Sequence, residues 1–442
     1  MIMEKVFEKF LQFRPAADEP VYDCRENCYM LLYRNVTEAE YTEWISALED
    51  DGMSVLQKNE LNGNLYTCLK GEVLVNALFT PCDGILRVAA SEVNLAPNFT
   101  PTSCEGDGET AFYGFESDQA LIDCGMCLMV QCPDYSFFVV DSGHYMQFND
   151  NDRIYNFMRE RTPEGQKVVV NGWLLTHAHS DHICKFMDFL RYNCHDVIIE
   201  GIYSNLIPDD YIGWKNWTRE EVLLSRKLFK MLAETKIPTY KIHTGQRFYI
   251  RNLAFDVLGT HEDIYPQLVE DYNDSSCMVM LTAENSRVFI PGDASVLASV
   301  ELEKRFGESL KCDVVQIAHH GHRGLSPRAY EYLNADVAVF PITRIKFDEE
   351  YPRMEANRRA IELARAHYIT SDGTVKIPLP YDFEKIEVLP DETFEDFGKI
   401  NRLWGYAYTD ERKAELYQMF TDRGGDLNKT NLPAEPDSKF EM

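Results

Sequence analysis

The sequence lacks an excess of basic residues, and it lacks long hydrophobic runs. Its 442 residues include 44 Lys and Arg against 72 Asp and Glu, a net charge of −28. Because non-specific binding to nucleic acid or anionic membrane needs basic patches, we expect neither partner. No apolar run approaches the roughly 18 residues of a membrane-spanning helix. Residues 1–5 also lack the charged-then-apolar order of a signal peptide, so we expect a cytoplasmic protein without a membrane anchor.

The cysteines do not show the regular spacing of a disulfide framework. The 12 cysteines are scattered along the chain, and in a reducing compartment most are expected to be small buried hydrophobic residues. Cys124 and Cys127 stand in a C-x-x-C arrangement. That pair falls inside a strand pattern with no helix after it, so a redox role is not expected.

The length of the chain allows one large domain and one smaller one. Residues 1–105 are expected to form a small α+β domain of unknown role. In it, Thr37 opens a helix that reaches Asp50, with Glu40 placed for a capping box, and Asn62-Gly63 joins two strands. Residues 106–390, in which strand pairs alternate with helices, are expected to form a layered α/β domain. Residues 391–442 are charge-rich and are expected to form a C-terminal extension.

Metal-ligand residues are concentrated in the segment Thr176–His182. His177, His179, Asp181 and His182 make four of its seven side chains ligand types, after an apolar strand-like run and before a segment with helical spacing. His177 and His179 are two apart in extended chain, so both rings leave on one side. Asp181 and His182 lie one turn further on. The pattern predicts two adjacent divalent ions, with zinc favoured and manganese or iron as alternatives; the alternative is a chance polar loop.

Further ligand candidates follow later strands of the expected α/β domain. Asp293 ends the run Phe289-Ile290-Pro291-Gly292-Asp293 and is expected to bridge two cations; the alternative is an N-cap for the next helix. His319 and His320 end another strand. Adjacent strand residues point oppositely, so we expect only one of them, His320, to bind metal and the other to pack behind it.

The third ligand of the first metal has three candidates. His261 follows a strand and precedes Asp293, and it is preferred over His243, which lies in a turn, and His195, which we expect at the surface. Asp141 ends an early strand. We expect it to orient the histidine motif rather than to bind metal, the alternative being an ordinary turn aspartate.

The pattern H-x-H-x-D-H over His177–His182 resembles the signature of the metallo-β-lactamase superfamily. Over residues 120–380 the order of segments is similar to that in the C-terminal metallo-β-lactamase-like domain of bacterial DNA-internalisation competence proteins. The similar segments are Ile122–Gly125, Val140–Gly143, His177–His182, Val257–His261, Asn273–Val279, Phe289–Asp293, Ala318–Gly321 and Tyr368–Gly373.

The chain departs from that resemblance in three ways. Met126-Cys127-Leu128 stands where Gln-Gly-Asp is usual, and Ile183-Cys184-Lys185 replaces the usual Gly-Gly pair after the metal motif. Channel-forming membrane segments are absent, so a DNA-uptake role is not expected. The resemblance implies a metallo-β-lactamase αββα sandwich, carried here by a soluble, stand-alone two-metal hydrolase with an additional N-terminal domain.

The expected chemistry is hydrolysis by a metal-bound hydroxide. Two cations lower the pKa of a shared water from 15.7 toward about 7; Asp181 holds the nucleophile's proton, and His322 protonates the leaving group or is simply a loop residue. The expected substrate is a small molecule or anionic ester, first a phosphoester or phosphodiester and otherwise a carboxylic ester, lactone or thioester. The alternative class is a non-catalytic, metal-stabilised binding protein. The sequence does not indicate the oligomeric state.

Overall fold

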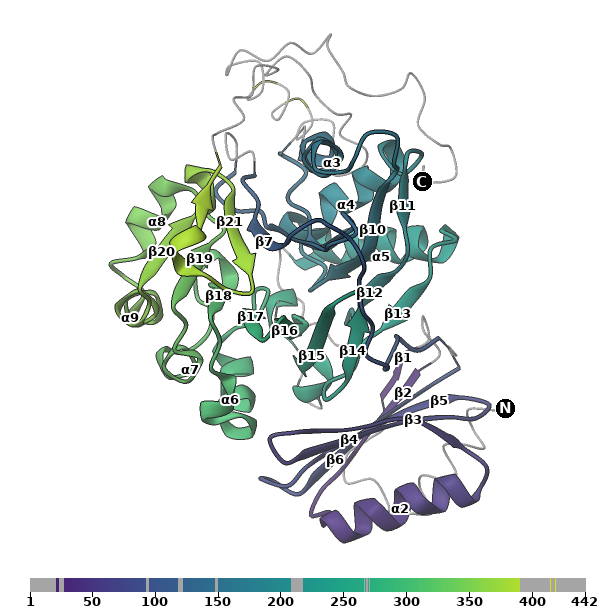
Figure 1. Cartoon of the computed structure of the whole chain (residues 1–442). Helices are drawn as coiled ribbons and strands as arrows, with labels where there is room; N and C mark the ends of the chain where they lie inside the picture. The colour runs from purple at the N-terminus through teal and green to yellow at the C-terminus, as the bar shows by residue number, and fades with distance from the viewer. Residues whose placement is uncertain are drawn as a thin grey trace.

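The computed structural model describes residues 21–23, 28–92, 95–117, 122–147, 150–207, 218–265, 267, 269, 271–389, 414 and 418. These residues form a mixed α/β structure with three sheets (Figure 1). No helix within these ranges is long and apolar enough to cross a membrane. The extension predicted for residues 391–442 lies outside the described residues, apart from positions 414 and 418.

A six-stranded antiparallel sheet forms the N-terminal part, with strand order β1-β2-β6-β5-β4-β3. One helix, α2, packs on one face of it (Figure 1), where Trp44 joins a core shared with the sheet. The predicted capping box of Thr37 and Glu40 is confirmed, as is the turn at Asn62-Gly63 between two paired strands. The elements are β1 Val21–Asp23, β2 Cys28–Tyr33, α2 Glu38–Asp50, β3 Ser54–Leu61, β4 Asn64–Lys70, β5 Leu74–Thr80 and β6 Ile85–Ser91.

The second sheet has nine strands in the order β13-β12-β10-β9-β8-β7-β21-β22, with β11 also paired to β10. Its strands are β7 Thr110–Gly114, β8 Cys127–Gln131, β9 Phe137–Asp141, β10 Val168–Leu175, β11 Val197–Ile199, β12 Ile202–Ser204, β13 Thr239–Lys241, β21 Val375–Leu379 and β22 Glu387–Val388. Residues 197–204 form two strands, β11 and β12, rather than one. Two short strands pair with successive parts of β10, whose pairing with β9 shifts register between Val170 and Gly172.

The third sheet has seven strands in the order β14-β15-β16-β17-β18-β19-β20. Its strands are β14 Arg247–Ile250, β15 Leu253–Gly259, β16 Met278–Ala283, β17 Ser286–Ile290, β18 Val314–Gln316, β19 Val337–Phe340 and β20 Ala366–Ile369. The helices that accompany the second and third sheets are α3 Asp150–Glu160, α4 Ser180–Tyr192, α5 Thr218–Glu234, α6 Val296–Arg305, α7 Pro327–Leu333, α8 Arg344–Glu350 and α9 Glu355–Leu363.

Three hydrophobic cores hold the second and third sheets and their helices together. One core contains side chains of both sheets, and in it the Phe138 and Phe255 ring centroids lie 4.3 Å apart. A second core joins the second sheet to α3, α4 and α5, with Trp173 packed edge-on against Phe186. The third core joins the third sheet to α6, α7 and α9. Burial of these apolar faces, worth about 25 cal/mol per Å², is what fixes the layers.

The loops that carry the ligand candidates meet because the second and third sheets pack against each other, and two of these loops follow neighbouring parallel strands of the third sheet. Strand β10 leads into the histidine motif, β17 leads into Asp293, and β18, parallel to β17, leads into His320. The backbone N–H of Cys277 donates to the Thr176 carbonyl at 2.9 Å. Gly292 has φ +59, and a Cβ there would lie 2.9 Å from the Thr176 Cβ. Glycine is therefore required where the loops after β10 and β17 touch.

The N-terminal sheet is tied to the rest of the chain by side-chain hydrogen bonds. Gln246 Nε2 donates to the Tyr66 hydroxyl at 2.8 Å, and Asn59 Nδ2 donates to the Gly245 carbonyl at 2.8 Å. Asn62 Nδ2 donates to the Arg305 carbonyl at 2.7 Å. These contacts join β3 and β4 to the loop before β14 and to the end of α6.

Candidate metal centre

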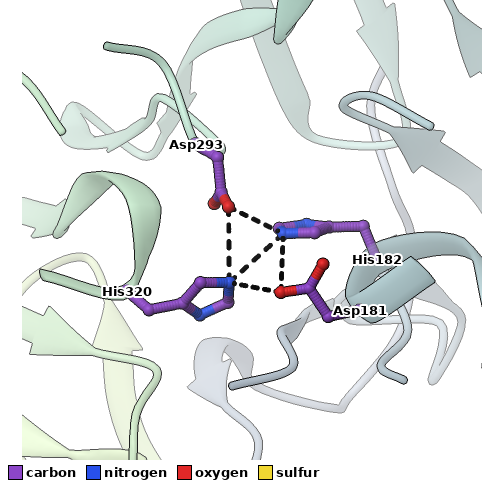
Figure 2. Close-up of side chains that lie close together, drawn as sticks. All are labelled: Asp181, His182, Asp293 and His320. Carbon is purple, nitrogen blue, oxygen red and sulfur yellow. Dashed lines mark hydrogen bonds and ion pairs between the residues drawn. The ribbon is translucent and has the colours of Figure 1, made fainter. Parts of the chain in front are cut away.

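Four side chains from three segments of the chain, one of them the start of α4, converge at one buried point (Figure 2). They are Asp181, His182, Asp293 and His320, and their ligand atoms all lie within 4.8 Å of one another. His182 Nε2 lies 3.1 Å from Asp293 Oδ2, and His320 Nε2 lies 3.1 Å from Asp181 Oδ2. Asp293 Oδ2 is also 3.4 Å from His320 Nε2. Two imidazoles and two carboxylates at this spacing are a donor set for a divalent transition metal.

A second pair of donors lies beside this four-residue cluster. His177 Nε2 and His179 Nδ1 face each other at 3.2 Å, and His177 Nε2 is 3.9 Å from Asp293 Oδ2. Asp293 is therefore a member of the cluster that also approaches the pair. Its other oxygen, Oδ1, is buried and has no hydrogen-bond partner. A buried carboxylate oxygen without a donor is costly unless a cation binds it.

The backbone and side chains behind His177 and His182 fix which ring nitrogen faces the centre. Asp141 accepts from the backbone N–H and the hydroxyl of Thr176 at 2.8 and 2.7 Å, and its Oδ2 lies 2.7 Å from His182 Nδ1. The Thr176 hydroxyl proton is thus used, so His177 Nδ1, 3.0 Å away, donates to that oxygen. In both rings Nε2 is left to face the centre, and Asp141 has the orienting role expected of it.

The other two rings are held in the same manner. His320 Nδ1 lies 2.7 Å from the Pro341 carbonyl, which leaves Nε2 toward the cluster. His179 Nε2 lies 3.2 Å from Asp271 Oδ1, which leaves Nδ1 toward His177. His177, His182 and His320 each have one ring nitrogen within hydrogen-bonding distance of a group behind the ring, and His179 Nε2 lies at ion-pair distance from Asp271. In all four rings the other nitrogen is directed inward, as in metal-binding histidines.

The two carboxylates of the cluster favour positive charge beside them. Burial would raise the pKa of Asp181 and Asp293, but His182 beside them holds both well below the usual range. Burial would lower the pKa of His320, yet Asp293 and Asp181 raise it to about 10. His177, by contrast, has its pKa lowered by burial and by the adjacent His182. In the protein alone, protons on histidine balance the carboxylates; divalent ions would take their place.

The structure separates His319 from its neighbour His320. Both residues have left-handed backbone, with φ 52 and φ 55. His320 points into the cluster, whereas His319 Nε2 lies 3.1 Å from Asn273 Nδ2 and its Nδ1 lies 3.3 Å from the Arg323 carbonyl. The ring of His322 packs against His319 with centroids 5.5 Å apart. Burial, with His320 next in effect, lowers the pKa of His322 to about 4.

The candidates for a third ligand of the first ion are not placed in the four-residue cluster. His261 Nε2 lies 2.8 Å from Asn205 Oδ1, and His243 Nδ1 lies 2.9 Å from Glu262 Oε1. His195 is exposed.

Two acidic residues at the site were not expected from the sequence. Asp271 accepts from the backbone N–H of Asn273 and caps the 3-10 helix Tyr272–Ser275. In the sequence it therefore looks like an ordinary turn aspartate. Glu221 of α5 accepts from the backbone N–H and the hydroxyl of Ser180, both at 3.0 Å. It thereby holds the start of α4, which carries Asp181 and His182.

Comparisons with known proteins give only distant likenesses. No family model matches the chain, and no curated protein matches it. Among solved structures it is similar to the metallo-beta-lactamase fold protein YhfI from Bacillus subtilis, with 12% identity and TM-score 0.37 over 59% of this chain and 96% of that one. It is also similar to CmlA, a diiron beta-hydroxylase from Streptomyces venezuelae, with 11% identity and TM-score 0.35 over 63% of this chain and 55% of that one. A third similar structure is unliganded yeast PDE1, with 12% identity and TM-score 0.33 over 58% of this chain and 94% of that one. We transfer neither fold nor activity from likenesses this weak.

Proposed function

We propose that this protein is a metal-dependent hydrolase with a dinuclear centre, built on a metallo-β-lactamase αββα sandwich. The observation that carries the proposal is that Asp293, a member of the four-residue cluster, also lies 3.9 Å from Nε2 of His177 in the His177–His179 pair. Two donor groups that share one carboxylate suit two adjacent ions. The narrower similarity to competence proteins stays a prediction, as does the division into residues 1–105, 106–390 and 391–442.

The residues divide into two ligand sets. His177 Nε2, His179 Nδ1 and Asp293 would hold one ion, and Asp181, His182, His320 and Asp293 would hold the other. Imidazole and carboxylate donors favour zinc, with manganese or iron as alternatives. His261 and His319 are not needed in either set. When bound, such ions lower the pKa of a water toward about 7 and polarise an ester oxygen.

The protein's own groups would orient the reactants and move protons. Asp181 is the only partly exposed member of the four-residue cluster, so its carboxylate can hold the proton of an attacking water. His322 lies in the same loop as His320, but its lowered pKa of about 4 leaves the ring unprotonated near neutral pH, which favours the alternative of a loop residue over a proton donor to the leaving group. Thr176, Asp141 and Asp271 keep the ligand rings in place.

The proposed substrate is a small phosphoester or phosphodiester. Two cations in one site match the charge of a phosphoryl group better than that of a neutral acyl group. The net charge of the chain, −28, does not prevent this, because ions are the largest local charges in such a site. Carboxylic ester, lactone or thioester hydrolysis is the alternative outcome of the test below.

The test combines metal analysis with two model substrates. Purified protein, loaded with zinc or manganese, should contain two ions per chain and hydrolyse bis(p-nitrophenyl) phosphate. Asp293→Ala should lose at least one ion and the activity, whereas the control Asp372→Ala, a surface carboxylate paired with Arg344, should change neither. Turnover of p-nitrophenyl acetate alone would favour the acyl alternative. Absence of bound metal would replace the hydrolase with a binding protein.

A further inference from the structure

A small cavity lies between the N-terminal sheet and the segments that flank β14 and β15. Its volume is about 20 Å³, a little more than the roughly 10 to 15 Å³ that one water needs. Asn76 of β5 and Arg87 of β6 line it from the N-terminal sheet, and His243, Glu262 and Asp263 line it from the rest of the chain. No residue of the two proposed ligand sets lines this cavity, so it is separate from the metal centre.

Arg87 brings a positive charge to the cavity. Its Nη2 donates to the backbone carbonyl of Asp263 at 3.1 Å, whereas Nε and Nη1 of the same guanidinium are buried and have no hydrogen-bond partner. Among the residues that the structure describes, no aspartate or glutamate forms an ion pair with Arg87, and the Asp263 carboxylate pairs with Arg305 instead. Because a buried charge is costly unless it is paired, these nitrogens favour a negatively charged acceptor beside them.

The side-chain amide of Asn76 adds a further donor, and its orientation is fixed by its neighbours. The backbone N–H of His243 donates to Gln246 Oε1 at 3.0 Å, so Gln246 presents Nε2 to the Tyr66 hydroxyl at 2.8 Å and to Asn76 at 3.2 Å. The Asn76 atom that meets this N–H group is therefore Oδ1, which also accepts from the Tyr66 hydroxyl at 2.5 Å. The other amide atom, Nδ2, is buried and has no hydrogen-bond partner.

The acidic residues that line the cavity have donors of their own. Both carboxylate oxygens of Glu262 lie beside His243 Nδ1, at 2.9 and 3.1 Å. Asp263 Oδ1 pairs with Arg305 Nη1 at 2.7 Å, and Oδ2 accepts from the Thr244 hydroxyl at 2.7 Å. The nitrogens without partners on Arg87 and Asn76 are all donors, so the occupant that they favour is an acceptor.

A second guanidinium strengthens the preference for negative charge. Arg305 and Arg87 both contact Asp263, one through its carboxylate and the other through its backbone carbonyl. Burial lowers the pKa of Arg87 and Arg305 lowers it further, although Asp263, Glu301 and Asp83 act in the opposite direction. The surrounding acids therefore do not fully compensate the charge of Arg87. A water would accept from the free N–H groups but leave that charge uncompensated, whereas an anion does both.

We propose that this cavity is a binding site for a small monovalent anion of the size of chloride, held by Arg87 and Asn76. A single-atom ion suits a cavity of about 20 Å³, whereas phosphate, sulfate or the carboxylate of a larger molecule exceeds it. Because its donors belong to β5 and β6 and the remaining lining belongs to the segments around β14 and β15, the bound anion joins the N-terminal sheet to the rest of the chain. The inference does not depend on the proposed hydrolase function.

Thermal unfolding tests the proposal in solution. The full chain is compared in sodium chloride and in sodium gluconate at equal ionic strength, with a chelator present so that chloride cannot act through a bound metal. Chloride at about 10 times its Kd should raise the Tm of the wild-type protein by about 2 °C, and the rise should saturate. Arg87→Gln should lose this rise, whereas the control Arg365→Gln, an exposed arginine paired with Glu384, should keep it. Equal Tm values of the wild-type protein in the two salts, or the same rise in Arg87→Gln, overturn the anion site.

A second measurement uses the unaltered protein, so it does not depend on how a variant folds. Long-wavelength anomalous diffraction from crystals of the full chain, grown at physiological chloride concentration, should show a chlorine signal beside Arg87 and Asn76. Density without that signal would identify the occupant as water and overturn the proposal. A signal that appears only in crystals grown in molar chloride would mean an adventitious ion only, which also overturns it. Each of these outcomes leaves the hydrolase proposal intact.

Discussion

His179 Nε2 lies 3.2 Å from Asp271 Oδ1, so a carboxylate before β16 fixes the ring of a histidine that follows β10. The same oxygen accepts from the backbone N–H of Asn273 at 3.1 Å and is thereby held in place. A carboxylate behind a ligand histidine sets its tautomer and raises its basicity. Asp271 therefore favours the ring orientation in which Nδ1 of His179 faces Nε2 of His177.

Asp271→Asn should weaken the binding of one of the two ions by about 10- to 100-fold. The asparagine amide can still contact the His179 ring, but it lacks the negative charge of the carboxylate. Zinc titration followed by native mass spectrometry would give the two affinities separately. Asp274→Asn, in the same 3-10 helix but bonded to Ser295, is the control. Two unchanged affinities in Asp271→Asn would show that the carboxylate does not act on the metal.

Replacement of His319 and of His320 should have opposite consequences. His320→Ala removes a nitrogen that lies 3.1 Å from Asp181 and 3.4 Å from Asp293, so one ion per chain should be lost. His319→Ala should keep both ions, since that ring contacts Asn273 instead. Elemental analysis after dialysis against a weak chelator distinguishes the two. Loss of an ion from His319→Ala would contradict the assignment.

The ligand cluster was largely predictable because its members follow strands that the apolar pattern marks. His177, His182 and Asp293 each come after a hydrophobic strand, and the packing of the second sheet on the third brings the loops after these strands together. The expectation that only one of His319 and His320 binds metal rested on alternation along a strand, whereas the structure separates them through two left-handed residues. The two side chains point apart because of these left-handed residues, which the apolar pattern of the sequence does not indicate.

Long-range partners were the part that the sequence could not supply. Asp271 lies in a loop of turn-forming residues, and only the fold shows that it meets His179. His261 has a suitable place in the chain, but its ring faces Asn205. Helices α3, α7 and α8 were not expected either. Their apolar faces are short, and packing against the sheets, rather than local pattern, stabilises them.

Gly245 permits a close contact between the N-terminal sheet and the rest of the chain. A Cβ at this residue, which has φ +93, would lie 2.8 Å from the Tyr66 Cβ. Gly245→Ala should therefore lower the free energy of unfolding by about 2 to 4 kcal/mol, from backbone strain and overpacking together. Urea denaturation measures the change.

Gly165 is the matched control for Gly245. It also has positive φ, +81, but a Cβ there meets nothing within 4 Å. Gly165→Ala should cost only the backbone strain, about 1 kcal/mol. Equal losses for the two variants would mean that the contact with Tyr66 relaxes without cost.

The pair of His243 and Glu262 should make stability depend on acid pH. Burial alone would raise the pKa of Glu262, but His243, 2.9 Å away, lowers it from 4.5 to about 2. A carboxyl with a depressed folded pKa contributes stability above its unfolded value, and that contribution is lost as pH falls from 4.5 toward 2. The shift corresponds to about 3 kcal/mol. Glu262→Gln should be less stable than the wild-type protein by about this amount at neutral pH.

The difference in the free energy of unfolding between Glu262→Gln and the wild-type protein should decrease as the pH falls. Urea unfolding in the presence of a chelator, measured in steps from neutral pH to about pH 3, gives the free-energy difference at each step without a contribution from metal. The exposed Glu308 provides the control, since Glu308→Gln should differ little from wild type at any pH. A gap that stays constant down to pH 3 would show that the ionised Glu262 does not stabilise the fold through His243.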